Sequence, residues 1–167
     1  MRVGITAFSH KAIDNLLDET VSVFREAGDL SRLSAVRKGD KPSDGGPASV
    51  TYASGNPQCG KGEFNLVAGT TWLFSSQVMI DGPVDVLVID EAGQLGLADA
   101  MAAATSATNV VLLGDPQQLP QVAQASHPAG SGVSVLEQVL GGDATVGSDR
   151  GVFLAETRRM HPDICTF

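Results

Sequence analysis

The sequence predicts an α/β fold whose sheet is mainly parallel and carries helices on both faces. Short apolar runs typical of buried strands alternate along the chain with segments whose apolar residues recur at helical spacing. The run VDVLVID at residues 84–90 is apolar at five of its seven positions. This is typical of a parallel strand that is covered on both faces.

In the first half of the chain, residues 2–7 are expected to form a buried strand. A helix should follow that begins near Ser9, a good N-cap residue, and ends near Gly28. Its apolar stripe consists of Ile13, Leu16, Leu17, Thr20 and Phe24. Three further short strands are expected, at residues 34–38, 50–53 and 65–68. Residues 41–47 are rich in Pro, Gly, Ser and Asp and predict a loop.

In the second half, the strand at residues 84–90 should be followed by an alanine-rich helix and a second buried strand, at 97–105 and 109–114. The prolines within and just before residues 117–132 predict a loop there. A helix at 133–140, a strand at 152–155 and a helix beginning near His161 complete the series. Residues 1–167 are thus interpreted as one domain, with 39–63 as a loop or insertion.

Composition narrows the class of protein. The chain has 167 residues, of which 43% are apolar and 18% are charged, so it is globular rather than disordered. No apolar run approaches the roughly 20 residues of a membrane span, and the N-terminus has no signal-peptide core. The two cysteines form no motif, so we expect a reduced, cytoplasmic protein with no membrane partner.

The net charge of −8 argues against a protein that binds nucleic acid by general electrostatic attraction. Residues 1–41 nevertheless carry 7 basic side chains against 6 acidic ones, whereas the rest of the chain carries 4 against 13. Contact with a phosphate backbone is therefore expected near the N-terminal part. A solvated helix face explains the same charges, and charge alone favours it.

Two polar segments follow the two best predicted strands. Asp90 and Glu91 end the first strand, where such a pair suits Mg²⁺ held by one carboxylate while the other orients an attacking water. The loop GDPQQLP at residues 114–120 follows the second strand, and parallel strands end at the same sheet edge. A glutamine there can reach a terminal phosphate. The alternatives are a solvated acidic turn and a polar, proline-bounded loop.

Three other segments carry weaker signals. The strand at 2–7 leads into a helix N-terminus bearing Ser, His and Lys, which suits a phosphate but also describes an ordinary capped helix. An arginine in ETRRMHP, residues 156–162, can neutralise phosphoryl charge, although paired arginines are more often surface residues. GNPQCGKG at 55–62 matches most of a P-loop, but its last residue is glycine and a strand follows, so we interpret it as a flexible loop.

Three words in this order, DEAGQ (90–94), GDPQQLP (114–120) and RMHP (159–162), resemble superfamily 1 helicases. The nearest branch is that of the RNA-surveillance and replication helicases. The wording is especially similar to bacterial helicases fused to a RecB-like nuclease. The resemblance covers most of the chain and implies a RecA-like P-loop NTPase fold, ATP and Mg²⁺ as cofactors, and single-stranded nucleic acid as partner, DNA favoured over RNA.

The resemblance also implies residue roles. Asp90 would serve Mg²⁺, and Glu91 would activate water. Coupling to the γ-phosphate would fall to Gln94, Asp115, Gln118 and Arg159. The nucleic-acid contacts would be Thr6, Ser9, His10, Thr70 and Thr71. One departure is Arg158, where the family often has an aromatic residue.

In the resembling family the P-loop lies upstream of the segment at 6–16, and only five residues precede that segment here. A second RecA-like domain and a nuclease domain follow in that family. We therefore expect a fragment of the first motor domain, inactive by itself, with an apolar edge left unpaired beside residues 109–114. Two alternatives remain open: a non-catalytic nucleic-acid-binding module, and a metal-dependent phosphohydrolase that uses Asp90, Glu91 and Asp115.

Overall fold

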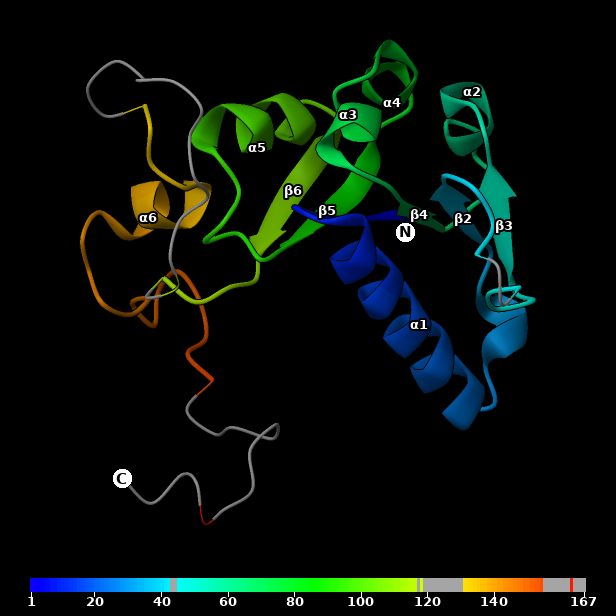
Figure 1. Ribbon diagram of the computed structural model, residues 1–167, viewed down its shortest axis with the longest axis horizontal. Coiled ribbons are helices and arrows are strands. Elements are labelled where there is room, and N and C mark those ends of the chain that lie inside the picture. The colour runs from blue at the N-terminus through cyan, green and yellow to red at the C-terminus, as the bar shows by residue number, and fades with distance from the viewer. Residues whose placement is uncertain (43–44, 117, 119–130, 155–162, 164–167) are drawn as a thin grey trace.

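The computed structural model describes residues 1–42, 45–116, 118, 131–154 and 163 (Figure 1). Six strands form one sheet in the order β3-β2-β4-β1-β5-β6, and all five neighbouring pairs are parallel. The predicted α/β class with a parallel sheet is confirmed. The sheet and its helices are consistent with a RecA-like P-loop NTPase fold.

The elements of the first half are β1 (Val3–Ala7), α1 (His10–Glu26), the 3-10 helix η1 (Leu30–Arg32), β2 (Ala35–Lys38), β3 (Val50–Ala53), α2 (Asn56–Cys59) and β4 (Leu66–Ala68). Those of the second half are α3 (Thr71–Phe74), α4 (Gln77–Asp81), β5 (Val84–Asp90), α5 (Leu97–Ala104), β6 (Ala107–Leu112) and α6 (Val135–Leu140). No helix in the described ranges is long and apolar enough to cross a membrane.

Helix α1 covers one face of the sheet (Figure 1). It begins as predicted, because the Ser9 side chain accepts a hydrogen bond of 3.0 Å from the Ala12 backbone N–H. Its buried residues are Ile13, Leu17 and Val21. These side chains pack against Ile5 and Ala7 of β1, so the amphipathic stripe of the helix holds it against the strand.

The opposite face of the sheet carries α3 and α5 (Figure 1). Phe74 of α3 is fully buried and packs in the same cluster as Leu87 of β5. The packing is close enough to require a glycine in β1. A Cβ atom on Gly4 would lie 2.6 Å from Cε1 of Phe74, inside any normal carbon–carbon contact.

Several sequence-based expectations were wrong. Residues 39–63 are not a continuous loop, because they contain β3 and α2. Residues 152–154 form no strand and are exposed. Helices α3 and α4 were not predicted, since four or five residues are too few to display a helical period. Most of the expected loop at 117–132 and the helix expected from His161 lie outside the described residues.

Strand β6 has a partner on one side only among the described residues, and it lies at the edge of the sheet. It is also poorly covered: Val111 is 43% exposed, and its neighbours Val110 and Leu113 are similarly accessible. An apolar edge strand with unpaired backbone groups favours pairing with another chain. The expected apolar edge beside residues 109–114 is therefore present.

We predict that Val111→Lys raises the monomeric fraction of the protein, because a charged side chain at an edge strand disfavours edge-to-edge pairing. Size-exclusion chromatography with light scattering over a range of concentrations measures this fraction. Met101→Lys is the matched control, since Met101 is 64% exposed but lies on α5. A wild-type chain that is already a clean monomer with a sharp cooperative melt would contradict the prediction.

Candidate functional site

The candidate site is built where β5 and β6 end. Because the two strands are parallel, their carboxyl ends meet at one edge of the sheet. Their pairing continues past the strands: the Leu113 N–H donates to the Ile89 carbonyl at 2.9 Å, and the Ala92 N–H donates to the Leu113 carbonyl at 2.8 Å. The turn at residues 90–93 is thereby fixed against residues 113–116.

The two turns approach each other so closely that glycine is needed in both. A Cβ atom on Gly93 would lie 2.6 Å from the backbone oxygen of Asp115. One on Gly114 would lie 3.0 Å from the backbone nitrogen of Ala92 and 3.3 Å from the Leu136 side chain of α6. Backbone therefore meets backbone at this point, which brings the side chains on either side of it together.

Asp90 and Glu91 are both partly buried at this edge. The Asp90 Oδ1 atom accepts a hydrogen bond of 2.9 Å from the Glu91 N–H. Glu91 has a φ of 53°, and among the described residues it is the one non-glycine residue with a positive φ. This conformation costs a residue with a side chain roughly 1–2 kcal/mol. Strained backbone of this kind is concentrated at functional sites, so it supports the role predicted for Glu91.

The glutamines of the two turns contact each other. The Gln94 Nε2 atom donates to the Gln118 Oε1 atom at 3.3 Å. The two residues come from different strand ends, and the sequence had predicted both as γ-phosphate contacts. Asp115 is exposed in the same turn as Gln118. The structure thus brings five predicted residues to one edge, whereas Arg159 lies outside the described residues.

The donor set at this edge can be compared with the needs of a metal ion. No group of three His, Cys, Asp or Glu side chains in the described part of the chain is arranged to hold a metal. Asp90, Glu91 and Asp115 therefore form no three-carboxylate metal site, which removes the support for the phosphohydrolase alternative. Mg²⁺ with a nucleotide needs only one or two protein carboxylates, because phosphates and waters fill the remaining positions. Asp90 fits that requirement.

A second group of predicted residues lies at the ends of β1 and β4. These strands are paired, and the Gly69 N–H donates to the Ile5 carbonyl at 3.1 Å, so residues 8–10 and 70–71 emerge side by side. His10 is exposed, and Ser9, Thr70 and Thr71 are partly buried. Thr6 differs from them, because its side chain is fully buried in β1 and cannot reach the surface without rearrangement.

Sequence reasoning overlooked Trp72, which follows the two threonines. Its side chain is 83% exposed at the start of α3, although tryptophan is usually well buried. It is also the single tryptophan of the chain. An aromatic residue directly after two hydroxyl residues was the signal that could have identified it.

The two groups are neighbours, since β1 pairs with β5 and Ala7 lies opposite Asp90. The carboxylates of the first group are therefore one strand away from the polar residues of the second. Both groups lie at the carboxyl edge of the sheet, which is where ligands bind in open parallel sheets.

The other perturbed groups lie near the amino end of β1. The Arg2 guanidinium donates to the carbonyls of Gly82 and Cys59 at 2.5 and 2.6 Å. Burial lowers the pKa of Arg2 and raises the pKa of the Cys59 thiol. Arg2 thus ties β1 to α2 and α4, and the buried Cys59 thiol is a core group.

The P-loop-like segment at residues 55–62 is not built as a phosphate site. Helix α2 begins at Asn56, before Gly60 and Lys61, whereas a P-loop must open a helix at its Gly-Lys step. Gly60 packs against the Val78 side chain of α4. The segment is nevertheless more ordered than the flexible loop that we expected.

Two comparisons with known proteins are informative. Residues 62–125 match a family described as an AAA domain. The chain is also 32% identical over 73 residues to a DNA replication ATP-dependent helicase/nuclease of Arabidopsis thaliana. That match covers 44% of this chain and 6% of the relative, so the chain spans a small part of the relative's length. Together with the parallel sheet, these matches support a superfamily 1-like helicase motor domain with a helicase-like ATPase character.

We predict that Gly93→Ala lowers the free energy of unfolding by about 1–3 kcal/mol, because the two turns must separate to admit the new methyl group. Chemical denaturation measures the change. Gly62→Ala is the control and should stay within about 0.5 kcal/mol of wild type, since nothing lies within 4 Å of the added atom. Equal denaturation midpoints for the two variants would show that the turns are not in tight contact.

Proposed function

We propose that this chain is part of an ATP-dependent helicase or translocase motor that couples ATP hydrolysis to movement on single-stranded nucleic acid. The observation that carries the proposal is the contact between Gln94 and Gln118 across the two turns, beside Asp90 and Glu91. Two amides and two carboxylates from adjacent strand ends supply the groups that a phosphoryl transfer site needs for a metal, a water and a terminal phosphate.

The roles follow from the position of each group. Asp90 would hold Mg²⁺, which when bound neutralises charge on the nucleotide phosphates. Glu91 would orient the attacking water and accept its proton. Gln94 and Gln118 would hydrogen-bond the γ-phosphate or that water, with Asp115 in the same turn. Arg159 would neutralise charge on the transferred phosphoryl group.

The surface formed by Ser9, His10, Thr70 and Thr71, together with Trp72, would bind the nucleic acid. Hydroxyl and imidazole groups suit phosphate oxygens, and an exposed indole suits stacking on a base. The relative's name includes DNA replication, which favours DNA over RNA as the strand. A second RecA-like domain and a nuclease domain would be further partners in the complete, cytoplasmic protein.

The pairing of β1 with β5 gives the two surfaces a route of communication. A change at Asp90 or Glu91 when the γ-phosphate leaves is one strand away from Ser9 and His10. A strained residue such as Glu91 can release its strain by changing conformation, so it suits a nucleotide-dependent switch. This supports coupling of hydrolysis to movement, rather than binding alone.

We predict that the 167-residue chain alone hydrolyses ATP at background rate. In a longer chain that joins an upstream GxxxxGK[ST] loop to this segment, nucleic acid should stimulate hydrolysis. There, Glu91→Gln should lower kcat by roughly 10²–10⁴-fold, because the proton acceptor is lost. Phosphate release measures the rate, and Glu63→Gln, an exposed acid-to-amide change, is the control. An unchanged kcat for Glu91→Gln would exclude the proposed role.

Binding to nucleic acid can be measured without hydrolysis, because Trp72 reports on the proposed surface. We predict that a dT20 oligonucleotide quenches the tryptophan emission of the 167-residue chain and that added salt weakens the effect. An rU20 oligonucleotide of equal length compares RNA with DNA. Quenching without any nucleotide turnover in the longer chain would favour the non-catalytic binding module.

The contribution of the indole itself is tested by anisotropy with a labelled dT20 oligonucleotide. Trp72→Ala should weaken binding by about 1–3 kcal/mol, the usual contribution of one base–aromatic stack. Val23→Ala is the matched control, since Val23 is an exposed apolar residue on α1. Equal affinities for the two variants would remove Trp72 from the nucleic-acid surface.

A further inference from the structure

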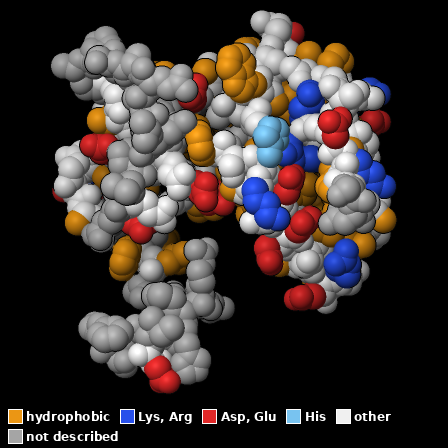
Figure 2. Space-filling view, viewed as in Figure 1, with side chains coloured by type: hydrophobic (Ala, Val, Ile, Leu, Met, Phe, Trp, Pro, Cys, Tyr) orange, Lys and Arg blue, Asp and Glu red, His pale blue; other side chains and the backbone are white. Residues whose placement is uncertain are grey.

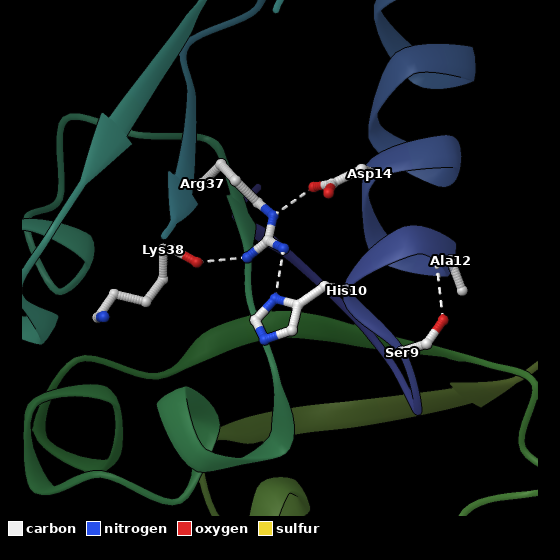
Figure 3. A network of polar contacts seen from close by, with 6 residues as sticks. All are labelled: Ser9, His10, Ala12, Asp14, Arg37 and Lys38. Carbon is white, nitrogen blue, oxygen red and sulfur yellow. Dashed lines mark hydrogen bonds and ion pairs between the residues drawn. The ribbon is translucent and has the colours of Figure 1, made fainter. Parts of the chain in front are cut away.

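Arg37 of β2 is a charged residue in the interior of the fold. Its side chain is only 4% exposed. The Nε atom donates to the Asp14 Oδ1 atom at 2.7 Å, and Nη1 donates to the Lys38 carbonyl (Figure 3). The third edge of the guanidinium, at Nη2, lies 3.0 Å from the Nδ1 atom of His10. Each edge of the buried charge therefore has a partner, as burial of an ion requires.

The contact with His10 fixes the protonation pattern of the imidazole. A guanidinium has hydrogen-bond donors and no acceptor, so the Nδ1 atom must be the acceptor. A neutral imidazole has one donor and one acceptor nitrogen, and the hydrogen must then be on Nε2. An Nδ1–H group would point a second donor at the guanidinium. Arg37 thus selects the Nε2–H form of His10.

The selected N–H group faces away from Arg37 (Figure 3). His10 is exposed at the first position of α1, directly after Ser9, and the ring is the pale blue group in the space-filling view (Figure 2). Asp14 holds the guanidinium on the side of α1, and the Lys38 carbonyl holds it on the side of β2. The ring is thereby oriented by a buried frame while its donor reaches the surface.

We propose that Arg37 is a positioning residue for nucleic-acid binding, because it holds His10 as a directed Nε2–H donor to a phosphate oxygen. This proposal rests on the proposed function of the surface around Ser9 and His10. It adds that the imidazole acts through a fixed, neutral hydrogen bond rather than through charge, which suits a chain whose net charge is −8. A simpler role for Arg37, joining α1 to β2, requires no defined state of His10.

The tautomer can be measured directly by two-dimensional ¹H–¹⁵N NMR of the histidine rings in the full chain. The chain has three histidines, and the His10→Gln spectrum identifies the His10 signals by their loss. We expect the Nε2–H form in wild type and a mixture of both forms in Arg37→Met. A wild-type ring in the Nδ1–H form, or already in the mixture, would overturn the proposal.

Binding of labelled dT20 then tests the purpose of the tautomer. The amide nitrogen of Gln approximates Nε2 of histidine, whereas the amide of Asn approximates Nδ1. We therefore expect His10→Gln to bind within about twofold of wild type, and His10→Asn and Arg37→Met to bind roughly tenfold more weakly, the effect of one hydrogen bond to a charged group. Arg32→Met is the charge-matched control, because Arg32 is an exposed arginine paired with Asp29, and it should bind within about twofold of wild type.

The outcomes separate this proposal from the function on which it rests. Wild-type affinity in His10→Asn overturns the donor role, while quenching of Trp72 by dT20 still supports the binding surface. Absence of both quenching and binding in wild type overturns the two together, and the NMR spectrum still reports whether Arg37 fixes the ring. If Arg37→Met does not fold, the comparison of His10→Gln with His10→Asn decides, since that side chain is exposed.

Discussion

The parallel pairing of β5 with β6 is the constraint on which the candidate site depends. Two polar turns that are more than twenty residues apart along the chain, such as those of Gln94 and Gln118, meet only because both strands end at one edge. The ladder then continues through Leu113, so the turns are held by backbone hydrogen bonds as well as by sheet geometry. Glycine at 93 and 114 removes the side-chain atoms that would keep the turns apart.

The same edge explains how an acidic chain can hold both anionic nucleotide chemistry and nucleic acid. The carboxylates at Asp90 and Glu91 suit a bound cation rather than a bare phosphate. The neighbouring surface, beyond β1, uses hydroxyl, imidazole and indole groups instead of a cluster of lysines. Recognition there depends on direction and stacking, for which a buried support such as Arg37 is more useful than added surface charge.

The helices make unequal contributions to this arrangement. Helix α1 is a long amphipathic element that both buries one face of the sheet and presents Ser9 and His10 at its start. Helix α6 is short, but Leu136 packs against the glycine contact between the two turns. Strand β6, in contrast, is exposed on its outer edge. The site is therefore supported from β1 and from α6, and least from the edge beside it.

The sequence by itself determined the strands, the long helix and the order of the site segments. Apolar runs and the Ser9 cap are local signals, and β1, α1, β2 and β5 formed where these signals predicted. Words such as DEAGQ and GDPQQLP also named Asp90, Gln94 and Gln118 without any structure. The short helices α2, α3 and α4 were missed, because their few residues are stabilised by packing rather than by a periodic pattern.

Only the tertiary structure decided which residues act together. The contact of Gln94 with Gln118, the burial of Thr6 and the exposure of Trp72 depend on strand neighbours that no local pattern reveals. The same is true of Arg37, which by sequence is one basic residue among eleven and by position is a buried link to His10. The physical reason is that propensity and periodicity act over a few residues, whereas burial and hydrogen bonding depend on segments far apart in the chain.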